Sequence, residues 1–426
     1  MVSQSVCNVL SVSPTSIDLF AGCGGLSLGL EQAGFETVFV NELHPNAMDT
    51  FLMNRFGSLV DDSKNRCFDI HDLTQNPDEL DALARRMRQE HGDITLVSGG
   101  PPCQGYSGIG HRRSFDITKD EIPSNHLYGE MAKFVSAIGP KAFVFENVRG
   151  LLTSRWTPAG DKGEIWRDVV QTFERIRVKR GRKVLEYRIG SKLVFAKEYG
   201  VPQNRPRVIM VGIRSDIDLN LDPNGVAGGF LPIPTGGAPN LIDLLGDLVD
   251  PKWMPGGATT TYRTNPKNAV QEALRQTREG EVLVKGDLLT EQEYSNHRPE
   301  VIEKFQYMID NGGEIPLRMQ TKKFAQRVLP SRWAANGPSI TATSLPDDFV
   351  HFSQPRTPTV REWARLQTFP DWYEFAGRRT TGGRRRAGDP GTGDWSRDVP
   401  KYTQIGNAVP VALGEAIGTH LLGLLD

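Results

Sequence analysis

The sequence has few of the features that mark secreted, metal-stabilised or membrane-embedded proteins. Its 426 residues include four cysteines, Cys7, Cys23, Cys67 and Cys103, and no two of them form a Cys-x-x-Cys pair. This spacing argues against a disulfide framework or a thiolate zinc site and suits a reducing compartment. No apolar run approaches the length of a bilayer span, and segment 1–14 lacks the charged start of a secretory signal. We therefore expect a cytoplasmic protein with no metal and no membrane partner.

An excess of charge of either sign is also absent. Lysine and arginine together number 50 and aspartate and glutamate 51, for a formal net charge of -1. A neutral chain predicts no polyanion partner, so any contact with DNA must come from local basic clusters. These clusters are Arg112-Arg113, Arg175–Arg188 and Arg378–Arg386. Charge runs are more often solvated faces than binding surfaces.

Short apolar runs alternate with helical patterns over roughly residues 15–214. Strands are predicted within 16–22 and at Thr37–Val40, Ile94–Val97, Ala142–Phe145 and Arg207–Ile213. Helices are predicted from Leu26 to Gly34 and at Leu127–Ile138 and Ile165–Ile176. This alternation indicates an α/β fold with a doubly wound, mainly parallel sheet of the Rossmann-like kind, occupying residues 1–214.

The composition changes after Arg214. Residues 221–265 are rich in Gly, Pro, Thr and Asn, and a short helix is predicted at Arg361–Leu366. Gly377–Asp398 is rich in Arg and Gly and is expected to be a mobile loop without an assigned role. We therefore expect a smaller, loop-rich domain at 215–400, followed by a C-terminal helix at 401–426 that returns to the first domain.

A candidate thiol follows one of the predicted strands. Gly99–Gly110 reads Gly-Gly-Pro-Pro-Cys-Gln-Gly-Tyr-Ser-Gly-Ile-Gly, and its prolines cannot continue a central strand. Cys103 is thereby placed at the carboxyl end of a strand, where open α/β sheets bind ligands. Taken alone, a Gly/Pro-rich loop with one cysteine is usually only a loop.

Two further stretches suit a nucleotide-like ligand. Phe20-Ala21-Gly22-Cys23-Gly24-Gly25 lies between a strand and a helix, and Glu42 follows about twenty residues later, where an acidic residue reaches ribose hydroxyls. Asp69-Ile70 suits an adenine, with Asp69 accepting from its amine. An ordinary turn with exposed acidic residues is the competing interpretation, and the glycines do not form the G-x-G-x-x-G of dinucleotide sites.

Three polar segments complete the candidate site. Glu146 directly follows the predicted strand Ala142–Phe145, and a carboxyl group beside apolar walls can hold or deliver a proton near neutral pH. Arg205 and Arg207 stand two apart at a strand start and can direct a guanidinium at a carbonyl or phosphate. Gln404–Pro410 opens the last helix and could close a cofactor site. Each segment alone also fits an ordinary structural role, in which Glu146 caps a helix, the arginines are solvated and Gln404–Pro410 only begins a helix.

Together, these segments resemble the DNA (cytosine-5) methyltransferases in their usual bacterial motif order. Pro-Pro-Cys-Gln-Gly, Glu-Asn-Val, Gln-x-Arg-x-Arg and Gln-Ile-Gly-Asn-Ala-Val-Pro are weak singly but specific as an ordered set, and the match covers residues 16–214 and about 331–425. The resemblance implies that S-adenosylmethionine is held by Phe20, Ala21, Gly22, Cys23, Gly24, Gly25, Glu42, Leu43, Asp69, Ile70, Pro102, Leu127, Asn407 and Val409. Leu43 departs from the aromatic residue that many relatives carry.

The same resemblance implies the reaction. Cys103 is the nucleophile, Glu146 meets the N3 edge of the cytosine, Arg207 binds its O2, and Arg205 supports the site. Thiolate addition to C6 makes C5 nucleophilic enough to take a methyl group, and the base must be flipped out of the double-stranded DNA. The glycine-rich segment after Cys103 would close over it. Arg356–Pro370 resembles the segment that organises target recognition.

The expected partners are double-stranded DNA and a cognate restriction endonuclease acting on the same site, with the enzyme itself a monomer associated with the nucleoid. Three alternatives stay open at this stage. These are a nicotinamide oxidoreductase on a similar sheet, a non-catalytic DNA-binding relative, and a methyltransferase that acts on RNA. The Cys103, Glu146 and Arg207 set disfavours the first, since hydride transfer does not require it.

Overall fold

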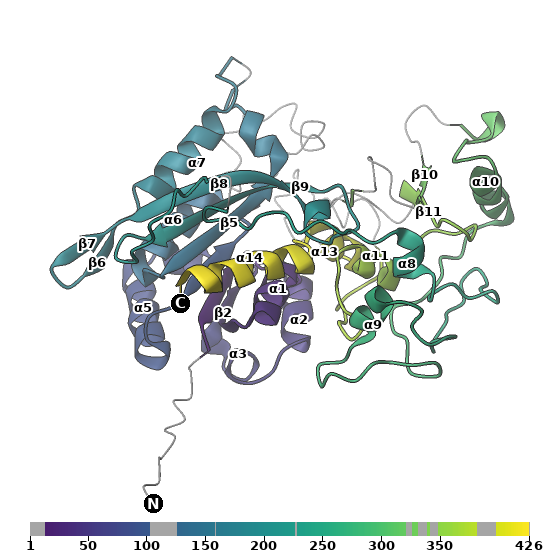
Figure 1. Ribbon diagram of the computed structural model, residues 1–426, viewed down its shortest axis with the longest axis horizontal. Helices are drawn as coiled ribbons and strands as arrows, with labels where there is room; N and C mark the ends of the chain where they lie inside the picture. The colour runs from purple at the N-terminus through teal and green to yellow at the C-terminus, as the bar shows by residue number, and fades with distance from the viewer. Residues whose placement is uncertain are drawn as a thin grey trace, which may run out of the picture.

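The computed structural model describes residues 13–102, 126–157, 159–225, 228–320, 326–330, 339–340, 348–380 and 398–425. Cys7, Cys103, the glycine-rich segment after Cys103, the Arg112-Arg113 pair and most of Gly377–Asp398 lie outside these ranges. Figure 1 shows a larger lobe built around a sheet and a smaller lobe that carries helices α8 to α11.

The larger lobe contains a seven-stranded sheet in the order β3-β2-β1-β4-β5-β9-β8. The strands are β1 (Thr15–Leu19), β2 (Glu36–Asn41), β3 (Arg66–Cys67), β4 (Leu96–Gly99), β5 (Ala142–Val148), β8 (Tyr187–Phe195) and β9 (Pro206–Arg214). The first five in that order run parallel, whereas β9 pairs antiparallel with both β5 and β8. The predicted α/β fold with a mainly parallel sheet is confirmed, but β3 and β8 were not predicted.

The strand order reverses at β1. From β1 the chain moves outward to β2 and β3, and it then crosses to the other side to add β4 and β5. The carboxyl ends of β1 and β4 therefore flank the switch point of the sheet, which is where doubly wound folds bind their ligands. The Phe20–Gly25 turn leaves one of these strands and the Gly100–Pro102 segment leaves the other.

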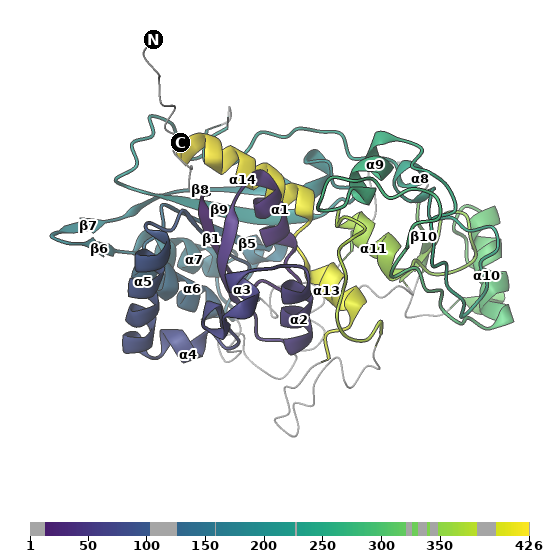
Figure 2. The ribbon, with the colours of Figure 1, turned by 90° about the horizontal axis from the view of Figure 1, so that it is seen from below.

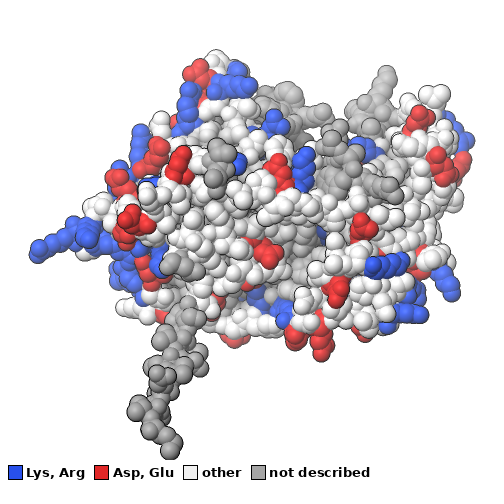
Figure 3. Space-filling view, viewed as in Figure 1, with Lys and Arg blue, Asp and Glu red and all other residues white. Residues whose placement is uncertain are grey.

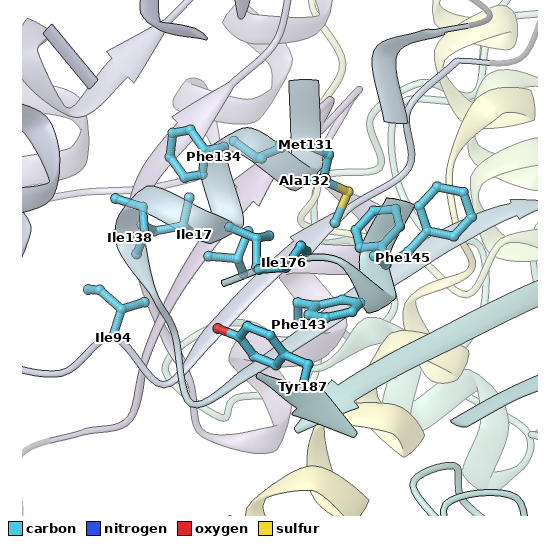
Figure 4. Packing of buried hydrophobic residues seen from close by; sticks show 14 of the residues in the cluster. Ile17, Ile94, Met131, Ala132, Phe134, Ile138, Phe143, Phe145, Ile176 and Tyr187 are labelled. Carbon is cyan, nitrogen blue, oxygen red and sulfur yellow. The ribbon is translucent and has the colours of Figure 1, made fainter. Parts of the chain in front are cut away.

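Helices cover both faces of this sheet. One face carries α5 (Pro77–His91), α6 (Leu127–Ile138) and α7 (Glu164–Glu174), and the other carries α1 (Gly25–Ala33) and α14 (Val411–Leu425) (Figures 1 and 2). Figure 4 shows the first core, where Phe143 of β5 packs against the ring of Tyr187 and Phe134 of α6 lies near Ile17. The predicted helix Leu127–Ile138 is confirmed to the residue.

Helices α1 and α14 approach each other through glycine. A Cβ atom at Gly25 would lie 2.3 Å from the carbonyl oxygen of Val409, and one at Gly29 would lie 2.2 Å from that of Val411. No other residue allows this backbone contact. It brings the end of the chain against the helix that follows the Phe20–Gly25 turn.

The C-terminal segment forms two helices rather than the single one predicted. Helix α13 (Lys401–Asn407) ends before Pro410, and α14 begins at Val411. By length and composition alone Lys401–Leu425 could cross a membrane, although it consists of the two helices α13 and α14. Half of its most apolar window is buried inside the protein, as in the core helices of many folds.

The smaller lobe includes α8 (Leu241–Leu245), α9 (Ala269–Arg275), α10 (Pro299–Asp310) and α11 (Val360–Leu366), with the short strands β10 (Arg327–Val328) and β11 (Phe349–Val350). Buried ion pairs hold it together. Arg365 pairs with Asp247 and Asp371, and Arg356 pairs with Glu362, and all five side chains are fully buried. These arginines belong to Arg356–Pro370, which therefore has a structural core role.

Short elements complete the described chain. In the larger lobe these are α2 (Pro45–Met53), α3 (Ser58–Asp61), α4 (His71–Thr74) and the hairpin of β6 (Val178–Arg180) and β7 (Lys183–Leu185). The hairpin lies within the basic run Arg175–Arg188, where no strand was predicted.

Candidate active site

The segment that leads to Cys103 is fixed by a hydrogen bond from the neighbouring strand. The Nδ2 of Asn147, on β5, donates to the carbonyl oxygen of Pro101 at 3.0 Å. Pro101 is buried and Pro102 is exposed, so the chain emerges at the carboxyl edge of the sheet as it approaches residue 103. Cys103 itself lies outside the described residues. Asn147 belongs to the Glu-Asn-Val motif, but the sequence did not predict that it anchors this segment.

Glu146 lies within β5 rather than beyond it, which corrects the predicted end of that strand at Phe145. Pairing with β9 extends β5 because Glu146 faces Ile209 and Val148 faces Arg207 in register. The Glu146 side chain meets the Arg207 side chain, with 2.5 Å between Oε1 and Nε. Their side chains are 12% and 11% exposed, so the pair is mostly withdrawn from water while remaining accessible at the edge.

Gly100 leaves space for this carboxylate. A Cβ atom at position 100 would lie only 2.8 Å from Oε2 of Glu146. The chain that carries Cys103 therefore runs past the Glu146 carboxylate three residues before the thiol. The Glu146 carboxylate and the Arg207 guanidinium thus meet at the edge of the sheet from which the chain runs on toward residue 103.

Arg205 has a different environment from Arg207. Its side chain is fully buried, and Nη2 donates to the carbonyl oxygens of Gly406 at 2.8 Å and Ala408 at 3.0 Å, while Nη1 donates to that of Ile340. Burial lowers the pKa of this guanidinium. A guanidinium at the C-terminal end of α13 satisfies helix carbonyls that lack a partner within the helix. Arg205 therefore holds α13 and Ile340 to the start of β9 and does not join the Glu146–Arg207 pair.

Gln203 reinforces this connection. It is fully buried, donates to the carbonyl oxygen of Leu366 at 2.6 Å and accepts from the backbone nitrogen of Ile340 at 2.9 Å. The first two polar residues of Gln-x-Arg-x-Arg thus join the two lobes, and the third reaches Glu146. Gln203 was not assigned a role from the sequence, although its place in the motif was a signal.

The Phe20–Gly25 turn adopts the backbone expected of a ligand cradle. Phe20, Gly22 and Gly24 have φ values of 55°, 57° and 82°, in the left-handed region that favours glycine. Phe20 tolerates this conformation because its backbone nitrogen donates to the Asn41 side chain at 3.2 Å. Asn41 also donates to the carbonyl oxygen of Phe68 at 2.8 Å, which ties the loops after β1 and β3 together. Asn41 was missed in the sequence.

Glu42 organises the same edge. Its carboxylate accepts from the backbone nitrogens of Gly22 and His44, both at 2.8 Å. Burial raises the pKa of this carboxyl group. Because these two bonds leave further lone pairs, Glu42 can still accept hydrogen bonds from a ligand's hydroxyl groups.

The remaining predicted cofactor residues lie mostly at the same carboxyl edge. Leu43 is 58% exposed directly after β2, Ile70 is buried after β3, and the half-exposed Asp69 carboxylate already accepts from the His71 backbone at 3.0 Å. Partly buried Leu127 begins α6, while exposed Asn407 and buried Val409 flank the break between α13 and α14.

Cys23 is the exception among the predicted cofactor contacts. Its side chain lies in the core, where the thiol donates to the carbonyl oxygen of Gln404 at 3.4 Å. Burial raises the pKa of this thiol to about 12. Only the backbone of Cys23 can meet a ligand, and the carbonyl oxygen accepts a hydrogen bond of 2.6 Å from Tyr373.

These residues fit S-adenosylmethionine. An added Cβ at Gly22 would meet no atom within 4 Å, so the turn is open to a ligand. Exposed apolar side chains at Leu43 and Phe68 offer faces for an adenine ring, and Glu42 offers acceptors for ribose hydroxyls. The group would supply an electrophilic methyl at the switch point of the sheet, next to the segment that leads to Cys103.

Comparison with known proteins agrees with this geometry. The model of the C-5 cytosine-specific DNA methylase family matches residues 15–423. The chain is 30% identical over 440 residues to the type II methyltransferase M.PspPI of Psychrobacter sp., covering 100% of this chain and 84% of that protein. It is 28% identical to M.DdeI of Desulfomicrobium norvegicum, covering 95% and 88% of the two chains.

A solved structure shows the same fold. It is a candidate DNA modification methyltransferase encoded within an E. coli prophage, and it is similar with a TM-score of 0.64 at 21% identity, covering 97% of this chain and 99% of that one. The family match spans nearly the whole chain and includes both lobes. This protein therefore belongs to the C-5 cytosine-specific DNA methylase family.

Proposed function

We propose that this chain methylates C5 of a specific cytosine in double-stranded DNA through Cys103, Glu146 and Arg207, with S-adenosylmethionine as methyl donor. DNA cytosine-5 methylation is the activity of its family. The observation that carries the residue assignment is the Glu146–Arg207 pair beside Gly100, three residues from the thiol.

Each of these groups has a distinct role in the reaction. The Cys103 thiolate forms a bond to C6 of the flipped cytosine, and the C5–C6 electrons move toward C5 as Glu146 protonates N3. Arg207 donates to O2 and holds the ring against the carboxyl group. C5 would take its methyl from S-adenosylmethionine, whose sulfonium would keep the electron pair of the broken S–C bond and leave as a neutral thioether. Water, as the proposed base, then takes the C5 proton, the C5–C6 double bond reforms as the Cys103 thiolate is expelled, and N3 returns its proton to Glu146.

The pairing of Glu146 with Arg207 suits this sequence of protonation states. In the absence of substrate, the guanidinium neutralises a carboxylate that is almost fully withdrawn from water. A cytosine that enters with N3 toward Glu146 and O2 toward Arg207 would replace that ion pair with two hydrogen bonds. The pair is therefore a resting arrangement that a pyrimidine edge can open.

The division of the chain is part of the proposal. Residues 1–214 form the catalytic and cofactor-binding domain, residues 215–400 recognise the target, and residues 401–426 return to the catalytic domain. The packing of α14 on α1 supports the last of these assignments, with α13 joined to the smaller lobe through Tyr402 and Ile405.

We also propose a biological setting. The relatives M.PspPI and M.DdeI are type II methyltransferases, which supports a role as the modification enzyme of a restriction–modification system with a cognate endonuclease. A monomer in the bacterial cytoplasm, associated with the nucleoid, suits a protein that carries its catalytic and recognition lobes on one chain.

The assignment is tested by Cys103→Ser. This variant should lose methyl transfer to host DNA while binding S-adenosylmethionine as the wild type does, because the thiol is not among the groups proposed to hold the cofactor. Methyl transfer at a near wild-type rate would refute the role of Cys103. Loss of cofactor binding together with activity would instead indicate that the variant is misfolded, which circular dichroism would show.

A further inference from the structure

The β6–β7 hairpin projects from the larger lobe on the side away from the smaller lobe (Figures 1 and 2). Its two strands are joined by Gly181 and Arg182 alone, and Gly181 has φ 60°. A positive φ at the first position of a two-residue connection is the requirement of a tight hairpin turn. The hairpin is therefore a defined element of the fold.

Its base is anchored to the body of the lobe. Val178 and Leu185 face each other across the hairpin and are buried in the main core. Arg180 forms an ion pair with Asp93, and its Nη2 donates to the carbonyl oxygen of Gly139 at 3.0 Å. These contacts fix the direction of the hairpin but leave its tip outside the protein.

The tip is strongly cationic. Lys179, Arg182 and Lys183 are exposed and form no ion pair with any residue that the structure describes. The end of the hairpin accordingly stands out as a block of basic side chains in Figure 3. Exposed Arg88 on α5 adds to the charge at its base, since with burial it lowers the pKa of Arg180.

This arrangement is unfavourable for folding by itself. Lys183 lies directly opposite Arg180 in the hairpin register, and like charges in that position destabilise a strand pair. Val184 is 60% exposed between these cations, so the tip buries little apolar surface in return. A chain with a net charge of -1 that gathers unpaired cations on one protruding ribbon gains from a polyanionic partner.

We propose that the β6–β7 hairpin is a second DNA contact, which binds the phosphate backbone of duplex DNA outside the target site. A two-stranded ribbon has the width to enter a major groove, and its lysine and arginine side chains would lie against the flanking phosphates. Duplex DNA is the substrate of this family, and it is a polyanion that extends beyond the target site on both sides. The contact would tether the enzyme to long DNA without sequence preference.

The test compares two triple variants of the full-length protein. Lys179→Gln with Arg182→Gln and Lys183→Gln removes the charge, and Lys179→Arg with Arg182→Lys and Lys183→Arg keeps it. Binding to a long mixed-sequence duplex is measured across a salt series without added cofactor. The neutral variant should bind several-fold more weakly, with a slope of log affinity against log salt that is smaller by about 2 to 3. The charge-keeping variant should match the wild type.

Methyl transfer to a short duplex that carries the target site supplies the second measurement. Its rate should be unchanged in both variants, since the hairpin does not touch the Glu146–Arg207 pair. The proposal would be overturned if the neutral variant and the wild type bound DNA with equal affinity and an equal salt slope. It would also be overturned if the neutral variant bound RNA duplexes more weakly than the wild type but bound DNA equally well. The hairpin proposal rests on DNA as the substrate, yet its binding measurement stands even if Cys103→Ser retains activity.

Discussion

Substitution of Gly100 by alanine tests the geometry of the active site without touching any reacting group. The added Cβ would lie 2.8 Å from Oε2 of Glu146, so the carboxylate must retreat on the order of 0.5 Å to reach ordinary contact. Its other oxygen is held 2.5 Å from the Arg207 guanidinium, which opposes the retreat. The φ of Gly100 lies outside the left-handed region, so the backbone itself accepts alanine.

The expected consequence is a loss of catalysis with the fold retained. A positioned acid contributes about 10²- to 10⁴-fold to a rate, and a displacement approaching 1 Å forfeits much of that. We expect kcat to fall roughly 10- to 100-fold in Gly100→Ala, with little change in the affinity for S-adenosylmethionine. Gly129→Ala in α6 is the matched control, because its Cβ would meet nothing within 4 Å.

A double-mutant cycle identifies the route of this effect. If the alanine side chain acts by displacing the Glu146 carboxylate, Gly100→Ala should lower the single-turnover rate of Glu146→Gln by much less than it lowers that of the wild type. An equal fold-loss in both backgrounds would refute the reasoning. It would mean that alanine acts on the backbone leading to Cys103 instead.

Three further predictions concern buried residues away from the proposed reacting groups. Tyr373→Phe removes the 2.6 Å hydrogen bond to the Cys23 carbonyl oxygen, and should weaken S-adenosylmethionine binding about fivefold in calorimetry with kcat unchanged; unaltered affinity would contradict a role for Tyr373 in shaping the turn. Arg205→Lys cannot satisfy both Ile340 and α13, and should lower the free energy of unfolding by about 2 kcal/mol in urea titration; full stability with abolished catalysis would contradict its structural role. Burial lowers the pKa of His351 to about 3, so the unfolded state takes up a proton first as the pH falls below about 6.5, and stability falls by up to about 1.4 kcal/mol per pH unit. His351→Asn should remove that slope in denaturant titrations, and an unchanged slope would contradict the assignment.

Much of the larger lobe follows from local signals in the sequence. The strand at Ala142 and the helix at Leu127–Ile138 are uninterrupted patterns bounded by glycine or proline, so periodicity alone locates them. The end of β5 was misjudged because Glu146 is polar. It is a strand residue through its pairing with β9, and that partner lies about sixty positions along the chain.

The predicted site shows the same limit. Motif order identified Glu146 and Arg207, whose side chains the fold brings together. It gave Arg207 and Arg205 different roles, but it did not predict the buried contacts of Arg205, because these arise from α13 and Ile340, far away in sequence. Asn41 and Tyr373 were missed for the same reason, since each acts through hydrogen bonds to backbone atoms of other elements. Exposed Arg182 and Lys183 were part of a basic run, but only the fold shows that they form a protruding tip.

Covalent trapping tests the central assignment most directly. Wild-type protein is incubated with S-adenosylmethionine and duplex DNA in which 5-fluorocytosine replaces cytosine, and is then separated by denaturing electrophoresis. Fluorine at C5 cannot leave as a proton, so the Cys103–C6 bond should persist and give a band of higher mass. Peptide mapping should place the DNA on Cys103, and Cys103→Ser should give no such band. A band that persists in Cys103→Ser, or its absence from a wild-type protein that methylates ordinary DNA, would contradict the account.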